Sequence, residues 1–252
     1  MNEALIDPET LPTAHGLPLA YCWRNQTGSL PLRSVRLPHH HKKNHPFGLE
    51  APSRFDTGPA DQPFDFSGHV RRLCADIARR CPELKHVDTS RLIFGMTQAR
   101  TGRRHGLQAR VTPLRFRKGK LTRQRHGVCY QVQRYFVEDR EILYLVTFCL
   151  PRFLDQDFDD KFITLFHEMY HLSPAFDGDL RRHPGRCALH TSSKNSYDTH
   201  MAHLVRQYLA DGADVSLHGF LRLNFNQLQH RHGSVVGVVV PRPKLIPIDG
   251  AQ

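Results

Sequence analysis

The stretch Thr164-Leu-Phe-His167-Glu168-Met-Tyr-His171-Leu-Ser173 carries the pattern His-Glu-x-x-His inside an apolar segment. On an α-helix His167 and His171 lie one turn apart on the same face, so both imidazoles can bind one cation, and Glu168 can reach a water on that cation. The acidic run at 156–161 and the apolar residues around the motif predict a buried helix. Because buried imidazoles and carboxylates need partners, the motif predicts a catalytic zinc site. The alternative is a helix whose His and Glu side chains hydrogen-bond within the core.

A catalytic zinc usually keeps three protein ligands and one open position, so the motif leaves one ligand to find. We favour His183, because Pro174 ends the motif helix and Gly178 permits a tight reversal that returns the chain to the metal. The other candidates for the third ligand are Asp177, Asp179, His190, His200 and His203. Asp177 and Asp179 could instead orient the metal-binding histidines through hydrogen bonds.

The chemistry expected of such a site is hydrolysis of a peptide bond. Zinc brings the pKa of a bound water towards neutrality and polarises the substrate carbonyl, while Glu168 takes the proton and returns it to the departing amine. A further donor should stabilise the oxyanion. The candidates for that donor are Tyr170, Arg181, Tyr197 and His200. The motif therefore predicts a hydrolase that uses Zn2+ and acts on a peptide or protein substrate.

The motif and the residues after it resemble the phage-type metallopeptidase family, whose members carry a His-Glu-Leu-x-His helix followed by Gly-x-Leu-Arg-Pro-His. The matching residues here are His167, Glu168, His171, Gly178, Leu180, Arg181 and His183. Arg182 stands where the family more often has proline. The resemblance covers roughly residues 85–210 and implies a small zincin-like fold, zinc and peptidase activity.

A weaker similarity links the chain to SprT-like proteases, which act on DNA-associated proteins and share the His-Glu-x-x-His helix with a late third histidine. Their usual His-Gly-x-x-Trp sequence is absent, since His183 precedes Pro184 and the only tryptophan is Trp23.

Hydrophobic patterning divides the chain into three parts. Residues 1–63 are proline-rich and without periodicity, which predicts a largely irregular arm, and 241–252 form a proline-rich tail. Residues 64–240 form the expected zincin-like domain, of class α+β. Its expected helices are 66–81, with Ser67 as N-cap, the motif helix and 196–211, and its expected strands are 91–96, 107–116, 126–137, 141–150 and 234–240. This order predicts a twisted, mostly antiparallel sheet with flanking helices.

The net charge of +11 is concentrated in one segment. Residues 89–137 contain no Asp or Glu but twelve Lys and Arg, whereas the rest of the chain is close to neutral. Such a segment could attract nucleic acid, an acidic protein substrate or an anionic surface, or form a solvated basic hairpin. It supports an alternative function, a basic nucleic-acid-binding protein with a structural or inactive metal site.

Two further groups of residues could bind metal, but we expect neither to do so. The histidines at 39–45 lie in the proline-rich arm, and Cys187 with His183 and His190 matches no finger spacing. The six cysteines are scattered, which predicts reduced thiols. No stretch is long enough to span a bilayer and the first residues lack a secretory signal, so we expect a cytoplasmic protein without a membrane partner.

Overall fold

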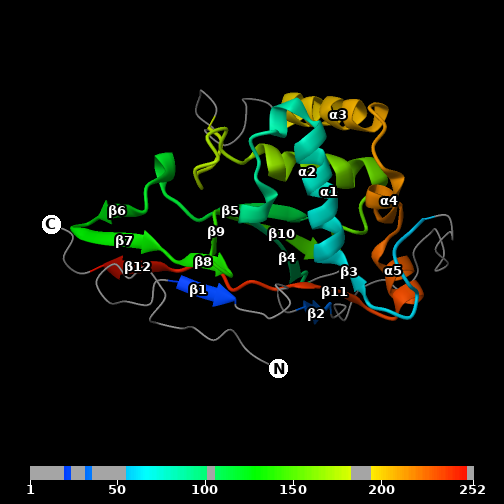
Figure 1. Ribbon diagram of the computed structural model, residues 1–252, viewed down its shortest axis with the longest axis horizontal. Coiled ribbons are helices and arrows are strands. Elements are labelled where there is room, and N and C mark those ends of the chain that lie inside the picture. The colour runs from blue at the N-terminus through cyan, green and yellow to red at the C-terminus, as the bar shows by residue number, and fades with distance from the viewer. Residues whose placement is uncertain (1–19, 24–31, 36–54, 101–105, 183–193, 249–252) are drawn as a thin grey trace.

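The computed structural model of the chain describes residues 20–23, 32–35, 55–100, 106–182 and 194–248, which form a mixed α+β architecture (Figure 1). The helices are α1 (Phe66–Arg80), α2 (Phe158–Tyr170), α3 (Lys194–Ala210), α4 (Val215–His218) and α5 (Phe225–His232), with short 3-10 turns η2 (Pro82–Leu84), η3 (Thr89–Arg91), η4 (Arg117–Gly119) and η5 (Gly219–Arg222). The strands are β1 (Ala20–Trp23), β2 (Leu32–Ser34), β3 (Phe64–Asp65), β4 (Leu92–Gln98), β5 (Ala109–Pro113), β6 (Thr122–Arg125), β7 (Val128–Val132), β8 (Arg134–Val137), β9 (Arg140–Ile142), β10 (Tyr144–Leu150), β11 (Val235–Val238) and β12 (Leu245–Ile248).

The sheet nearest the motif helix has the strand order β4, β10, β5. β10 runs parallel to β4 and antiparallel to β5, with Val146 opposite both Phe94 and Val111. Every residue of β10 except Thr147 is buried, as expected of a central strand. Figure 1 shows α1, α2 and α3 gathered on one face of this sheet, so the motif helix lies directly over β5 and β10.

The described strands divide among four three-stranded sheets, whereas the sequence predicts a single twisted sheet. The other three sheets have the orders β1-β8-β9, β2-β11-β3 and β12-β7-β6. Five of the eight strand pairs are antiparallel, so antiparallel pairing predominates as predicted. The expected strand 126–137 is divided into β7 and β8 at Gln133, whose amide donates to Lys244 O at 2.8 Å. The expected strand 141–150 is divided into β9 and β10 at Leu143, whose amide donates to Arg91 O at 2.8 Å.

The first helix is capped by a different residue from the one predicted. Asp65 is the N-cap, and its carboxylate accepts the Gly68 amide at 3.0 Å. Ser67 lies inside the helix, where its hydroxyl accepts the Val238 amide at 2.8 Å and so ties α1 to β11. The helix ends at Arg80 with Cys81 as its C-cap, one residue before the predicted end, and Pro82 follows as the sequence predicts.

Segments outside the expected domain also contribute strands. β1 pairs with β8, β2 pairs with β11 and β12 pairs with β7. The sequence predicts a largely irregular arm and no strand in the tail, and the structure adds the short strands Ala20–Trp23 and Leu32–Ser34 in the arm and Leu245–Ile248 in the tail. Each of these strands has only three or four residues, too few to show a two-residue period.

A buried lysine joins the motif helix α2 to the 3-10 turn η5. Lys161 is 2% exposed, and its Nζ donates to Leu221 O at 2.9 Å and to Leu223 O at 2.7 Å. Burial lowers the pKa of Lys161 to about 7, while Asp155 and Asp157 oppose the shift. α2 is thus joined to η5 through a polar contact inside the core.

Candidate metal centre

The motif lies in the last turns of α2, which places its two histidines side by side. His167 is in the helix and His171 is its C-cap. Their Nε2 atoms are 2.9 Å apart, and the two rings are almost perpendicular, at 83°. Both side chains are partly buried. The expected convergence of the two imidazoles on one point is therefore present.

The spacing of the two Nε2 atoms fits a shared zinc ion closely. Zinc binds imidazole nitrogen at about 2.0–2.1 Å with tetrahedral angles, which puts two such nitrogens about 3.3 Å apart. The 2.9 Å separation is about 0.4 Å shorter than that value, and it is also the length of a hydrogen bond in which one imidazole donates to the other. The two nitrogens therefore lie close to the spacing that two zinc ligands require.

Glu168 contacts strand β5. Its side chain is buried, with 7% of the residue exposed, and the backbone N–H of Val111 faces the carboxylate. Burial raises the pKa of Glu168 to about 7, and the Val111 amide opposes the shift. A carboxyl group with that pKa can both take up and release a proton near neutral pH.

The edge of β5 that faces away from β10 is the one next to Glu168. Leu114 N donates to Leu143 O at 3.0 Å and Cys149 N donates to Gln108 O at 2.8 Å. Because inward and outward residues alternate along an antiparallel strand, Val111 directs its backbone groups away from β10. Within the described residues β5 pairs with β10 alone, so its outer edge can accept another extended chain.

Tyr197 of α3 covers the histidine pair. Its side chain is 3% exposed, and its ring centroid lies 4.8 Å from that of His167 and 5.9 Å from that of His171. Tyr170 lies 5.7 Å from Tyr197, and the Arg181 guanidinium lies 3.9 Å above the Tyr170 ring. Three of the four oxyanion candidates are therefore gathered around the two histidines.

The predicted reversal after the motif helix is confirmed. Leu172 and Leu180 form an isolated antiparallel bridge, and Arg181 N donates to His171 O at 2.7 Å. Gly178 has φ +86°, and a Cβ atom there would lie 2.5 Å from Arg115 Cγ, so both the conformation and the space require glycine. The segment 172–182, called the return loop from here on, thus brings the chain back to the second histidine of the motif.

The remaining candidates for the third ligand fall into two groups. His183, His190 and Cys187 lie outside the described residues, as do the histidines at 39–45. Within the described ranges, no three His, Cys, Asp or Glu side chains form a group that could hold a metal. Asp177, Asp179, His200 and His203 therefore do not join the pair, which leaves His183 as a prediction from the sequence.

Asp179 and His200 have other partners. The Asp179 carboxylate accepts Lys118 N at 3.0 Å, Leu180 N at 2.8 Å and Arg182 Nη2 at 2.9 Å. Burial alone would raise the pKa of Asp179, but these hydrogen bonds outweigh it and lower the pKa. His200 Nε2 lies 3.0 Å from Glu83 Oε2, away from the pair. In the described structure the Asp179 carboxylate is thus bound by Lys118, Leu180 and Arg182.

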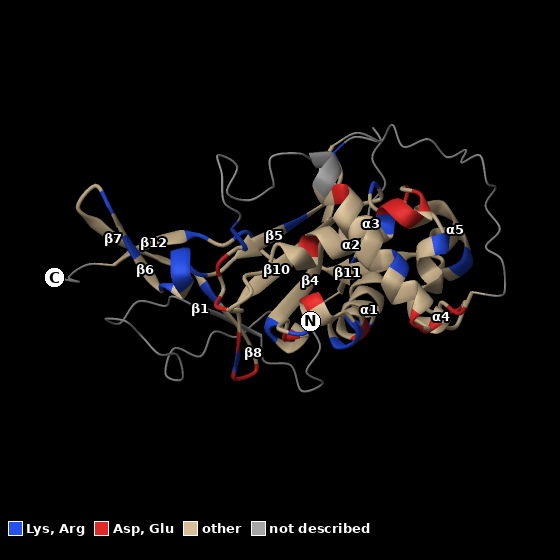
Figure 2. Ribbon diagram, turned by 90° about the horizontal axis from the view of Figure 1, so that it is seen from above, with Lys and Arg blue, Asp and Glu red and all other residues tan. Residues whose placement is uncertain are grey.

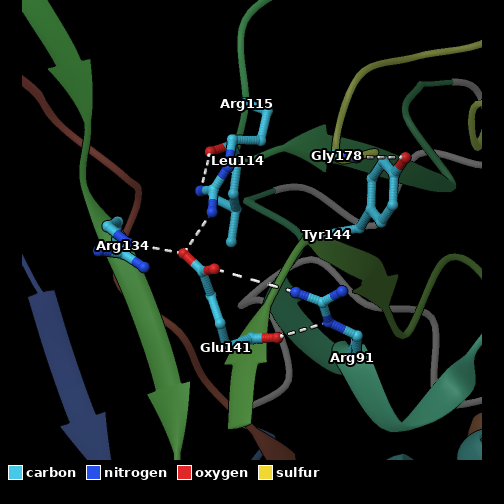
Figure 3. A network of polar contacts seen from close by, with 7 residues as sticks. All are labelled: Arg91, Leu114, Arg115, Arg134, Glu141, Tyr144 and Gly178. Atoms are coloured by element: carbon cyan, nitrogen blue, oxygen red, sulfur yellow. Dashed lines mark hydrogen bonds and ion pairs between the residues drawn. The ribbon is translucent and has the colours of Figure 1, made fainter. Parts of the chain in front are cut away.

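Two residues that the sequence does not single out help to build the site. Val111 is inconspicuous in an apolar strand, and only the strand pairing places its amide against Glu168. The Tyr144 hydroxyl accepts Gly178 N at 2.9 Å and donates to Asp179 O at 2.8 Å, so β10 holds the return loop (Figure 3). Neither contact has a local sequence signal.

Comparisons with protein families, with curated proteins and with solved structures found no match. None of the helices in the described ranges is both long and apolar enough to cross a membrane. The geometry of the site thus has to carry the functional argument.

Proposed function

We propose that the protein is a zinc-dependent peptidase with a zincin-like catalytic domain. The observation that carries the proposal is the convergence of His167 and His171, with Nε2 atoms 2.9 Å apart, beside a buried glutamate on the same helix. The same 2.9 Å separation also fits a hydrogen bond between the two imidazoles, so the zinc content of the protein decides between a metal-binding pair and a contact within the core. His183 is the proposed third ligand.

In the proposed mechanism His167, His171 and His183 hold the zinc, and Glu168 moves the proton. Zinc, when bound, supplies a Lewis acid that acidifies water and polarises a carbonyl group. Glu168 takes the proton of the attacking water and delivers it to the amine that leaves. Its burial suits this role, because a pKa of about 7 lets one carboxyl group serve as base and then as acid.

The proposed substrate is an extended polypeptide that lies along the outer edge of β5. An extended chain can add to a free strand edge through backbone hydrogen bonds, which are independent of sequence. The edge passes Glu168 at Val111, so the backbone of a chain bound there would run beside the general base. Tyr197 and Arg181 are the proposed donors to the oxyanion.

The experiment that tests the proposal is zinc analysis of the purified protein together with a casein hydrolysis assay. We expect about one zinc per chain in the wild type, as a single catalytic site requires, and a large loss in His171→Ala and in His183→Ala. His203→Ala is the matched control, because His203 is an exposed histidine on α3 and should leave zinc unchanged.

Glu168→Gln separates metal binding from catalysis. It should keep its zinc and lose activity by about 10²- to 10⁴-fold, as removal of a general base does. A wild type that takes up no zinc after reconstitution would overturn the proposal. So would a Glu168→Gln variant that hydrolyses casein at the wild-type rate.

A further inference from the structure

A cavity of about 1150 Å³ lies at the carboxyl end of β5, between η4, strands β6 and β7 and the return loop. Its wall carries the basic residues Arg115, Arg117, Lys118, Lys120, Arg123 and Arg182, and Asp179 is the one acidic residue in its lining. Figure 2 shows basic residues gathered around β6 and β7, at the end of the molecule away from α4 and α5. Most of the residues that line the cavity thus belong to the acid-free segment 89–137.

Four of the six basic residues in the cavity wall form no ion pair in the described structure. Arg115 binds Glu141 at 2.5 Å (Figure 3), and Arg182 binds Asp179 at 2.9 Å. The other four are exposed and, within the described ranges, form no ion pair: Arg117, Lys118, Lys120 and Arg123. Their combined field favours an anionic ligand.

The cavity wall is held in place by backbone contacts. Lys118 has φ +59°, a left-handed conformation that directs its amide to the Asp179 carboxylate at 3.0 Å. Gly119, at φ +69°, packs so closely on Asp177 that an added Cβ would lie 3.0 Å from it. A non-glycine residue in the left-handed region is costly, and the hydrogen bond from the Lys118 amide to Asp179 offsets part of that cost and fixes the backbone beside the cavity.

The position of the cavity favours a polypeptide as its occupant. Val111, whose amide faces Glu168, and Pro113, which lines the cavity, are two residues apart on β5, about 7 Å along the strand. A chain lying along this edge would pass from Glu168 to the cavity within two or three residues. Among the described residues Phe116 alone gives the lining an aromatic ring, whereas single-stranded nucleic acids stack successive bases on several such rings.

We infer that the cavity is a substrate subsite that binds the Asp or Glu side chains of the polypeptide, a few residues from the bond that is cut. The inference rests on the proposed peptidase function and adds the class of substrate. The basic segment would then select acidic substrate sequences, and Arg117, Lys120 and Arg123 would contact the substrate carboxylates.

The test measures binding without hydrolysis, in the full chain carrying Glu168→Gln. A fluorescent glutamate-rich peptide is compared by anisotropy with the same peptide carrying glutamine at each glutamate, and with a single-stranded DNA of similar length. Arg117→Gln, Lys120→Gln and Arg123→Gln together should weaken binding of the acidic peptide about tenfold, because each exposed ion pair contributes a factor of about two. Arg71→Gln, Lys85→Gln and Arg206→Gln remove three exposed charges elsewhere and should leave binding unchanged.

The outcomes separate this inference from the proposed function. Tighter binding of the acidic peptide that is lost in the cavity variant and kept in the control variant supports the subsite. Equal binding of the two peptides overturns it, even if zinc content and casein hydrolysis establish a peptidase. DNA that binds more tightly than the acidic peptide, and is released by the same cavity substitutions, also overturns it and assigns the cavity to nucleic acid.

Discussion

Replacing Glu141 by glutamine should destabilise the protein, because one carboxylate holds three arginines from distant parts of the chain. Arg115 and Arg134 bind its Oε1 at 2.5 and 2.6 Å, and Arg91 Nη2 lies 3.9 Å from its Oε2 while Arg91 Nε donates to the Glu141 backbone carbonyl at 3.1 Å (Figure 3). The Glu141 side chain is 15% exposed, Arg134 17% and Arg115 8%, so water can replace little of the lost charge.

The size of the effect follows from leaving these guanidinium groups without their anion. Breaking a buried ion pair by removing one partner costs roughly 3–5 kcal/mol. Glutamine keeps the volume and one acceptor oxygen, so the lower end applies, about 3 kcal/mol in the free energy of unfolding. For a chain of this size each kcal/mol lowers Tm by about 2–4 °C, so Glu141→Gln should melt about 6–12 °C below the wild type.

The dependence on pH gives a second check. Burial alone would raise the pKa of Glu141, but hydrogen bonds from Arg134 and Arg115 outweigh it and hold the pKa below its usual value. A carboxyl group with a lowered pKa stabilises the fold above its unfolded pKa of about 4.3, and that contribution is lost as the pH falls through the folded pKa. The difference between wild type and Glu141→Gln should therefore be full at pH 7 and shrink below about pH 4.3.

Thermal melting followed by circular dichroism measures this difference, and Glu138→Gln is the control. Glu138 is an exposed residue in the β8–β9 turn, and its replacement should change Tm little. A Tm for Glu141→Gln as close to the wild type as that of the control would refute the reasoning. A difference that stayed constant down to acid pH would show that the lost stability does not come from the carboxylate charge.

Three other substitutions test the surroundings of the metal centre. Gly178→Ala places a Cβ 2.5 Å from Arg115 Cγ at φ +86°, so it should lower the free energy of unfolding in urea by about 1–3 kcal/mol. Burial lowers the pKa of Lys161 to about 7 in the folded protein, so between about pH 7 and 10 the unfolded wild type binds one more proton than the folded wild type. Lys161→Met removes this difference in proton binding. Wild-type stability should therefore rise relative to Lys161→Met across that range, as measured by urea unfolding at several pH values. Tyr197→Leu removes the ring packed on both histidines and should weaken zinc about tenfold in a chelator competition, whereas Tyr197→Phe keeps the ring and the affinity.

The parts of the structure that the sequence predicts well have local signals. The α2 pattern combines an acidic first turn with apolar spacing, and its end is marked by Pro174. Gly178 marks the reversal, and the chain does return to His171. These features depend on residues a few positions apart, where periodicity and backbone preference are informative.

The parts that the sequence does not predict depend on distant partners. Alternation continues through Gln133 and Leu143, so nothing local shows that the strands there change sheets. The sequence predicts Ser67 as the N-cap of α1, whereas the structure has Asp65. Both side chains can cap a helix, but the Ser67 hydroxyl accepts the Val238 amide of β11 and the Asp65 carboxylate accepts the Gly68 amide. Three-residue strands carry too little pattern to be found at all.

The basic segment shows how charge counting alone misleads. Arg91, Arg115 and Arg134 contribute to its excess of positive charge, yet all three are held by Glu141, which follows the segment in sequence. Among the described residues of the segment, exposed side chains around η4 and β6 line the cavity, while Arg100 and Arg110 are exposed elsewhere, so the function of the segment is argued from the cavity.

The return loop couples the two proposed sites through direct contacts. His171 O accepts the Arg181 amide, Leu172 pairs with Leu180, and the Asp179 carboxylate accepts the Lys118 amide at the cavity wall. One rigid segment therefore fixes both the second histidine of the motif and the shape of the cavity. A change that displaces this loop, such as Gly178→Ala, must act on both, so it should weaken zinc and the acidic peptide together. Removal of cavity charges at Arg117 or Arg123 leaves the loop contacts in place and should weaken the peptide alone.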